Sequence, residues 1–147
     1  MTRTATTLSA AVLIAAALAG PATAEESISY QNLVSPVFSG DTTVIDQPIA
    51  YPDGTPEVTV VVVTIPPGGE TGWHVHAVPL FAYVLEGAVT VDYGEKGIKV
   101  IEAGDGILEA MNWPHNGMNK GDTPLRILAV YMGEAGVANA EDAPAPK

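Results

Sequence analysis

Hydrophobic positions occur in short runs along most of the chain, and turn-forming residues separate the runs. The runs are rich in Val, Ile and aromatic residues, which favour the pleated surface of a β-sheet. The intervening clusters of Gly, Pro, Asp and Asn are typical of turns. After residue 40, no run shows the sustained 3.6-residue period of an amphipathic helix. The predicted strands are residues 42–45, 57–65, 80–85, 88–93, 97–101, 106–108 and 125–131. Many short strands at close spacing predict an all-β sandwich or barrel.

The N-terminus has a different pattern, in which one basic residue is followed by an apolar stretch. Arg3 precedes the Ala- and Leu-rich residues 8–19, and Gly20-Pro21 then leads to the small residues 22–24. This order is that of a secretory signal peptide cleaved before Glu25. The apolar stretch is shorter than the ~20 residues that span a bilayer. We therefore expect a secreted or periplasmic protein without stable membrane insertion, with an uncleaved anchor as the alternative.

The chain has room for one folded domain, because its 147 residues are about what a single hydrophobic core requires. We expect a signal peptide at residues 1–24, an N-terminal arm at 25–40 that packs on or swaps between subunits, a β-domain at 41–133 and a flexible tail at 134–147. The tail ends in an Ala- and Pro-rich stretch that has no bulky apolar side chain to bury.

Seventeen acidic residues face six basic ones, for a formal net charge of -11. This charge disfavours nucleic acid and anionic membranes as partners. It keeps an exported protein soluble, or it attracts cations and cationic substrates. The chain contains no cysteine, so it forms no disulfide and offers no thiolate ligand. Any metal ion must be bound by histidine and oxygen donors.

The three histidines are the first candidates for chemistry. His74 and His76 are two residues apart, and His115 follows a separate strand bounded by glycine. Residues i and i+2 of a strand point to the same face, so the imidazoles of His74 and His76 should project to one side. A metal ion needs such convergence. Taken alone, an H-x-H pair is more often a chance or structural feature than a metal site, so the surrounding residues decide.

Those residues resemble the two motifs of the cupin superfamily, and the match covers most of the chain after the signal peptide. The first motif is Gly, an H-x-H pair, Glu and Gly at set spacing; the second is Gly, Pro-x-Gly, His and Asn. The matching positions are Gly68, His74, His76, Leu80 and Gly87 for the first motif, and Gly104, Ala110, Asn112, His115 and Asn119 for the second. The histidines and the outer glycines keep the family spacing. Leu80 replaces the Glu, and Ala110 and Asn112 replace the Pro and Gly.

The resemblance implies an all-β, single-domain cupin jelly-roll β-barrel in which the two motifs lie on adjacent antiparallel strands. His74, His76 and His115 would meet inside the barrel around one divalent metal ion, which in this family is Fe, Mn, Zn, Ni or Cu. The resemblance also implies a homodimer, because cupins commonly pair through exposed sheet edges and an N-terminal arm.

Leu80 changes the expected ligand set, because strand alternation should place it on the same interior side as the histidines and leucine cannot coordinate. Without the family Glu, the site has three neutral ligands and an extra open coordination position, as in the cupin-type three-histidine oxygenases. Glu109 and Glu70 are candidates to replace the missing carboxylate, as a ligand or as an acid–base group; both also fit ordinary surface acids. Glu109 is the stronger candidate because its neighbours are apolar, and a carboxylate buried there is costly unless it is paired or coordinated.

The family hosts enzymes and binding proteins, so two classes of function remain open. The first is a metal-dependent enzyme acting on a small organic molecule, either a dioxygenase or a lyase or isomerase. The second is a non-enzymatic cupin that senses or stores a metal ion or small ligand; an unmetallated cupin is a third option. We expect a substrate pocket formed by aromatic and soft apolar side chains, which otherwise belong to the core: Trp73, Phe81, Tyr83, Met111 and Trp113. Asn116 and Asn119 are either turn residues or partners that orient His115.

Overall fold

The computed structural model describes residues 29–146. Residues up to Val34 and residues from Ser35 onward form two separate units. The described part of the first unit contains the short 3₁₀ turn η1 (Tyr30–Asn32). The expected signal peptide at 1–24 and the start of the expected arm lie outside the described residues. Within residues 29–146, no helix is long and apolar enough to cross a membrane.

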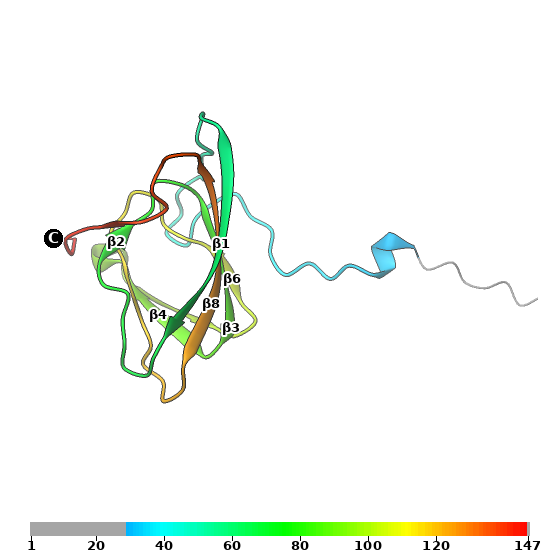
Figure 1. The fold of residues 1–147 in the computed structure, drawn as a ribbon. Coiled ribbons are helices and arrows are strands. Elements are labelled where there is room, and N and C mark those ends of the chain that lie inside the picture. The colour runs from blue at the N-terminus through cyan, green and yellow to red at the C-terminus, as the bar shows by residue number, and fades with distance from the viewer. Residues whose placement is uncertain (1–28, 147) are drawn as a thin grey trace, which may run out of the picture. The chain divides into compact units, whose positions relative to one another are not determined.

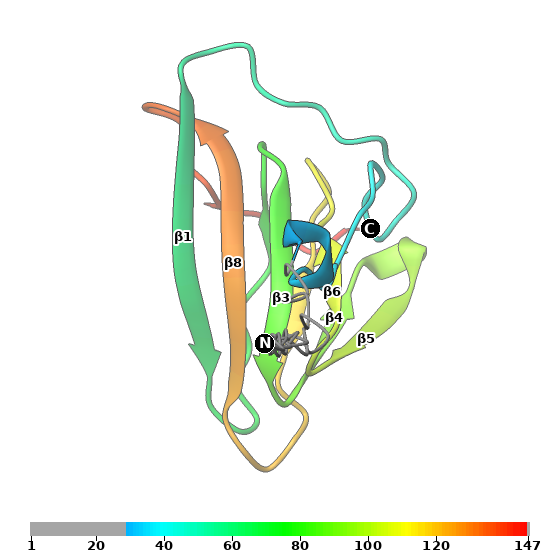
Figure 2. The ribbon, with the colours of Figure 1, turned by 90° about the vertical axis from the view of Figure 1, so that its right-hand side faces the viewer.

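The second unit contains a four-stranded antiparallel sheet with the order β1-β8-β3-β6 (Figures 1 and 2). Its strands are β1 (Pro56–Ile65), β8 (Leu125–Glu134), β3 (Leu80–Glu86) and β6 (Gly106–Leu108). The strands β1 and β8 are paired along their whole length, from Pro56 opposite Glu134 to Ile65 opposite Leu125. This long pairing gives one wall of the domain a regular alternation of side chains.

Shorter strands form the opposite wall. The sheet β5-β4-β7 is built from β5 (Ile98–Glu102), β4 (Ala88–Asp92) and β7 (Asn116–Met118), with η2 (Gly94–Lys96) in the turn between β4 and β5. A second pair joins β2 (His74–Val75) to β9 (Glu141–Asp142). The bridge between His74 and His115 connects β2 to the residue before β7, so the two pieces are continuous.

The hydrophobic core lies between the two walls, because every second side chain of each strand points inward. From β1, Ile65 is buried, and from β8, Leu125 and Ala129 are buried. The core cluster consists of Ile65, Val84, Val89, Val91, Tyr93, Ile101, Ala110 and Leu125. This arrangement confirms the all-β jelly-roll. Among the described residues, hydrogen bonding does not close the barrel, so the jelly roll takes the form of two facing sheets.

Six of the predicted strands correspond to β1, β3, β4, β5, β6 and β8. The seventh prediction, 42–45, is wrong. Thr42 forms only an isolated bridge with Pro48, and the chain turns between them through Asp46, which has a positive φ of 65°. Four β-favouring residues are therefore not enough when a polar turn follows at once.

The C-terminal segment differs from the flexible tail that we expected at 134–147. The strand β8 extends to Glu134, and β9 pairs with the histidine-bearing strand β2. The amide of Ala143 also donates a hydrogen bond to the carbonyl of Trp73 at 3.0 Å. Strand pairing uses backbone groups and needs no bulky side chains, so composition alone did not reveal this strand.

Candidate metal centre

The two histidine-bearing segments lie side by side and antiparallel. His74 is in β2, and His115 directly precedes β7. Their backbones form a reciprocal pair, in which each amide donates to the other residue's carbonyl at 3.0 Å. This pairing confirms the expected arrangement of the two motifs on adjacent strands. It also places the His115 side chain beside that of His74.

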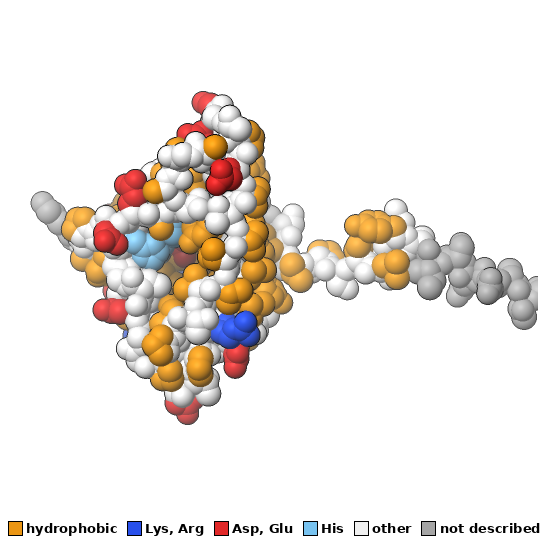
Figure 3. Space-filling model, in the orientation of Figure 1, with side chains coloured by type: hydrophobic (Ala, Val, Ile, Leu, Met, Phe, Trp, Pro, Cys, Tyr) orange, Lys and Arg blue, Asp and Glu red, His pale blue; other side chains and the backbone are white. Residues whose placement is uncertain are grey.

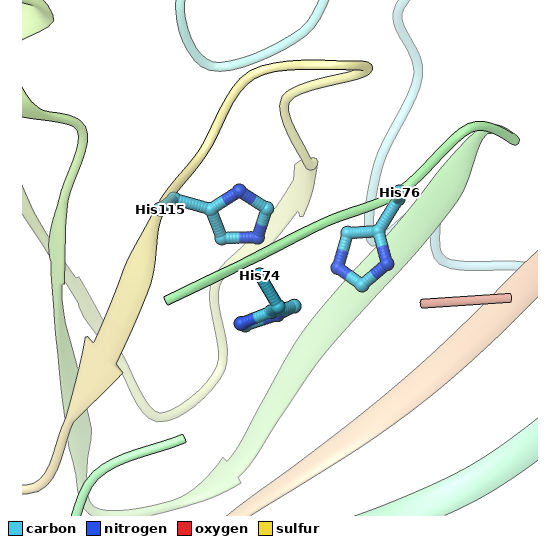
Figure 4. Close-up of side chains that lie close together, drawn as sticks. All are labelled: His74, His76 and His115. Carbon is cyan, nitrogen blue, oxygen red and sulfur yellow. The ribbon is translucent and has the colours of Figure 1, made fainter. Parts of the chain in front are cut away.

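The three imidazole rings converge (Figure 4). Ring centroids are separated by 4.9 Å for His74 and His76, 4.4 Å for His74 and His115, and 5.0 Å for His76 and His115. One ring nitrogen from each residue lies within 4.8 Å of the other two. A single ion with bonds of ~2.0–2.1 Å can be reached by all three after small side-chain adjustments. The convergence predicted from strand alternation is confirmed.

Hydrogen bonds orient each ring in the same way. The Nδ1 atoms donate to the carbonyl oxygens of Gly72 (His74, 2.9 Å), Asn139 (His76, 2.8 Å) and Trp113 (His115, 2.9 Å). A carbonyl can only accept, so each Nδ1 carries the proton and each Nε2 has a free lone pair. Backbone carbonyls in this role are typical of histidines that bind metals. The donor set therefore fits a divalent ion.

Burial also keeps two of the ligands neutral. Burial lowers the pKa of His76 to about 3, although the hydrogen bond to Asn139 acts in the opposite direction. Burial likewise lowers the pKa of His115 to about 4. Metal ions bind neutral imidazole, so at neutral pH these two side chains do not have to lose a proton before binding.

Leu80 faces the same cavity as the three histidines and is buried. The expectation that this position points inward without offering a ligand is therefore confirmed. The Leu80 carbonyl accepts a hydrogen bond of 2.9 Å from the amide of Glu109. A carboxyl group thus enters the cavity from the segment next to the position where the family motif has its Glu.

Glu109 follows β6 directly and is buried, with 7% of its surface exposed. Its Oε1 accepts hydrogen bonds from the Tyr93 hydroxyl at 2.6 Å and from the Ala110 amide at 2.7 Å. Among the described residues, no fully buried side-chain oxygen lacks a partner, so Oε2, which has no protein donor there, is open to the cavity. Burial raises the pKa of Glu109, and the two hydrogen bonds oppose this rise.

The site also contains two tyrosines that the sequence analysis did not identify. Tyr93 is completely buried and holds Glu109, sixteen residues away in the chain. Tyr131 lines the cavity, with its ring 5.5 Å from that of His76. Burial raises the pKa of both hydroxyl groups. The only signal in the sequence was their location at the inward positions of predicted strands.

The carboxylate of Glu70 does not join the three histidines. It is exposed, and its carboxylate accepts a hydrogen bond of 3.0 Å from the side chain of Asn116. Neither asparagine orients His115, since the carbonyl of Trp113 does so, and the Asn119 side chain donates to the carbonyls of Ile65 and Thr123. Strand parity explains this for Asn116, which follows His115 in the chain and so points away from the cavity.

The cavity is small and mainly aliphatic, with a volume of about 80 Å³. Figure 3 shows the histidines in a hollow bordered by hydrophobic side chains. Of the described residues that line it, Glu109 is the only acid and none is Lys or Arg. The five residues expected to form the pocket, Trp73, Phe81, Tyr83, Met111 and Trp113, do not line it. The lining residues include Val63, Ile65, Ala82, Val84, Val89, Val91, Ile101, Ile107, Ile127 and Ala129.

Comparison with known families agrees with this geometry. The model of the cupin domain matches residues 61–131, a range that contains all three histidines and Glu109. Residues 61–131 are therefore a cupin domain. No curated protein matches its sequence closely.

Solved structures show the same cupin fold. An uncharacterized double-stranded β-helix protein from Klebsiella pneumoniae is 23% identical, with a TM-score of 0.51 over 84% of this chain and 95% of that one. The DMSP lyase DddQ from Ruegeria pomeroyi is 19% identical, with a TM-score of 0.52 over 61% of this chain and 45% of that one. Oxalate decarboxylase from Lactobacillus farciminis is 23% identical, with a TM-score of 0.50 over 58% and 26%. This cupin spans less than half the length of either enzyme, and at these identities the likeness shows the fold alone.

Proposed function

We propose that this cupin is a metal-dependent enzyme that acts on a small organic molecule. One observation carries the proposal: three imidazoles with free Nε2 atoms converge in the same cavity as a buried carboxyl group with one open oxygen. A site that only stores a metal ion gains nothing from a second titratable group kept inside an apolar cavity, because burying that group is costly.

The histidines would hold one divalent ion, and Leu80 would leave its remaining positions open. A bound divalent ion supplies Lewis acidity toward substrate or water and, if it is ferrous iron, a place for dioxygen. The protein contributes orientation, because each Nδ1 is held by a backbone carbonyl. We favour a dioxygenase, for which a neutral three-histidine set with open positions is suited; a lyase or isomerase would use the same residues.

Glu109 is the proposed acid–base residue. Its Oε1 is held by Tyr93 and Ala110, so the carboxyl group keeps one orientation while Oε2 exchanges a proton with the substrate. Burial raises its pKa, and a raised pKa makes a carboxyl group a better candidate to donate a proton as well as to accept one. Tyr93 is a positioning residue and does not reach the substrate.

The lining defines the class of substrate. Without Lys or Arg among the described lining residues, an anionic substrate would find no counter-charge other than the metal ion. Near the mouth, beside His74 and Tyr131, lie the acidic residues Glu141 and Asp142 of β9. We therefore propose a small neutral or cationic molecule with an apolar part. The excess of acidic residues in the chain acts in the same direction.

Export is part of the proposal and rests on the N-terminal pattern. The intact mass of the protein recovered from its own extracytoplasmic fraction tests it. A mature chain that begins at Glu25 is expected, whereas a chain that begins at Met1 would indicate an uncleaved anchor.

The function is tested first by metal analysis of the protein purified from its own host, and then by assays of protein loaded with Fe, Mn, Ni, Cu or Zn. Oxygen uptake and product formation are measured with a panel of small neutral and cationic organic molecules. Turnover that is lost in Glu109→Gln while the metal content is unchanged would support the enzyme. Binding of metal and ligand without any turnover would support the non-enzymatic alternative, and a metal-free protein would contradict both.

A further inference from the structure

His76 differs from the other two histidines in what holds its ring. The rings of His74 and His115 donate to carbonyls only two residues away in the chain. The ring of His76 donates to the carbonyl of Asn139, which is 63 residues further along the chain, at 2.8 Å. The orientation of His76 therefore depends on how residues 139–146, which we call the C-terminal strap, are held against the domain.

The C-terminal strap passes beside the mouth of the site (Figure 1, red). After β8 the chain turns at Gly136, whose φ of 85° lies in the left-handed region that glycine favours. The strand β9 then pairs with β2 and places Asp142 opposite His74. Further on, the ring of Pro146 lies against Gly94 of η2, where an added side chain would clash with it. The chain thus crosses from the β8 wall to the wall that holds β2 and η2.

The strap is held mainly by its backbone. Residues 140–142 are exposed, so they bury little apolar surface. The hydrogen bonds of the strap include the pairing of β9 with β2 and the bond from the amide of Ala143 to the carbonyl of Trp73 at 3.0 Å. A segment with few buried apolar contacts opens at a much lower free energy than the core does. Each opening releases the His76 ring from its acceptor.

A released imidazole is a poorer ligand. The carbonyl of Asn139 keeps the proton of His76 on Nδ1 and fixes the plane of the ring, so that Nε2 points toward the other two histidines. Without this acceptor, the ring can rotate or carry its proton on Nε2. Conversely, an ion bound to Nε2 holds the ring in the orientation that the docked strap requires. Thermodynamic linkage makes these two effects equal in size.

We propose that the C-terminal strap is a positioning element of the metal centre, in which Asn139 acts through His76. Docking of the strap raises the affinity for the ion, and the bound ion stabilises the docked strap by the same factor. This inference rests on the proposed metal-dependent function, because it requires the three histidines to hold an ion. Since β9 also borders the hollow at the mouth, an ion leaves faster when the strap is open.

Zinc titration of the full chain tests the proposal through Ala143→Pro and the matched control Ala145→Pro. Proline at 143 removes the amide that donates to Trp73, whereas the amide of Ala145 makes no backbone hydrogen bond to another described residue. Ala143→Pro should lower zinc affinity by about tenfold or more, the usual effect of losing a group that orients a ligand. Ala145→Pro should stay within about twofold of the wild type. Both variants should unfold at the wild-type temperature without metal, since neither residue belongs to the core.

Hydrogen exchange followed by mass spectrometry tests the reverse effect. In the wild type, zinc should slow exchange of the amides of residues 139–143 by about the factor that Ala143→Pro costs in affinity. The control is His76→Ala, in which zinc should leave exchange in the strap unchanged. A purely structural strap would show the same exchange with and without zinc.

The outcomes separate this inference from the proposed function. If Ala143→Pro binds zinc as tightly as the wild type, the strap does not position His76, and the metal centre stands. Equal losses in Ala143→Pro and Ala145→Pro would also overturn the inference, because the effect would not come from the bond to Trp73. So would exchange in the strap that zinc does not change. A wild type that binds no zinc, manganous or ferrous ion would overturn both the metal-dependent function and the role of the strap.

Discussion

The inner and outer faces of the sheet β1-β8-β3 are both apolar, yet they differ in what lies over them. The inner face is closed by the second sheet, and a few polar groups enter it at one place, where His76 and Glu109 are held by hydrogen bonds. The outer face has no such groups between the ends of β8, and Val58, Val60 and Val62 of β1 remain exposed. Apolar character alone therefore does not identify a site. Satisfied polar groups inside apolar surroundings do so.

The largest expected effect comes from removing an inner ligand. His76→Ala should abolish stoichiometric metal binding, with an affinity loss of more than about 100-fold, because two imidazoles hold an ion far less tightly than three. Calorimetric titration with zinc or manganous ions measures this. The outer-face control Val62→Ala should bind as the wild type does. Equal metal affinities for His76→Ala and the wild type would contradict a metal site in this cavity.

Glu109→Gln should reduce turnover by about 10²- to 10⁴-fold, the usual contribution of an acid–base residue, while metal affinity changes less than about threefold. Gln keeps the size of the side chain and can still accept from Tyr93, so the proton-transfer role is removed selectively. Steady-state kinetics and metal titration are measured on the same preparation. Tyr93→Phe is the companion variant, and a positioning role predicts a shifted pH profile of turnover with metal binding retained.

A matched pair of leucines compares the two faces by stability. Leu125 is fully buried on the inner face, and Leu85 is 41% exposed on the outer face. Leu125→Ala should lower the free energy of unfolding by about 3–5 kcal/mol, since it leaves a cavity, and Leu85→Ala by less than about 1 kcal/mol. Urea denaturation at low protein concentration measures both. Equal losses for the two variants would contradict this difference between the faces.

A gain in metal affinity is expected at the position where the family motif has Glu. Leu80→Glu should raise the affinity for divalent ions about tenfold and reduce or abolish any oxygenase turnover, because it fills a coordination position that substrate or dioxygen would use. Leu80→Gln is the control for size and polarity and should not raise affinity. If Leu80→Glu has no effect while Glu109→Gln destroys binding, Glu109 is already the fourth ligand.

Several features of the site followed from local rules. The spacing of His74 and His76 was enough to place their rings on one side, because strand parity has a period of two. Position 80 was correctly expected to face inward for the same reason. Glu109 was singled out because a carboxylate among apolar residues needs a partner, although the partner, Tyr93, could not be named. Tyr93 follows β4 and Glu109 follows β6, so the two residues meet only in the folded domain. No short-range pattern in the sequence connects them.

The all-β class, most strand positions and the choice of the three histidines as metal ligands could be predicted from the sequence, because each depends on short-range patterns of hydrophobicity and spacing. Phe81 and Tyr83 lie outside the cavity because they alternate with the inward Leu80 and Ala82 on β3. Tertiary structure alone decided that Tyr93 and Tyr131 belong to the site. It also decided that Glu70 stays outside, that β9 completes the wall beside β2, and that the carbonyl of Asn139 orients His76. The last two contacts each use a backbone group that is distant in the chain, and backbone groups are the same in every residue.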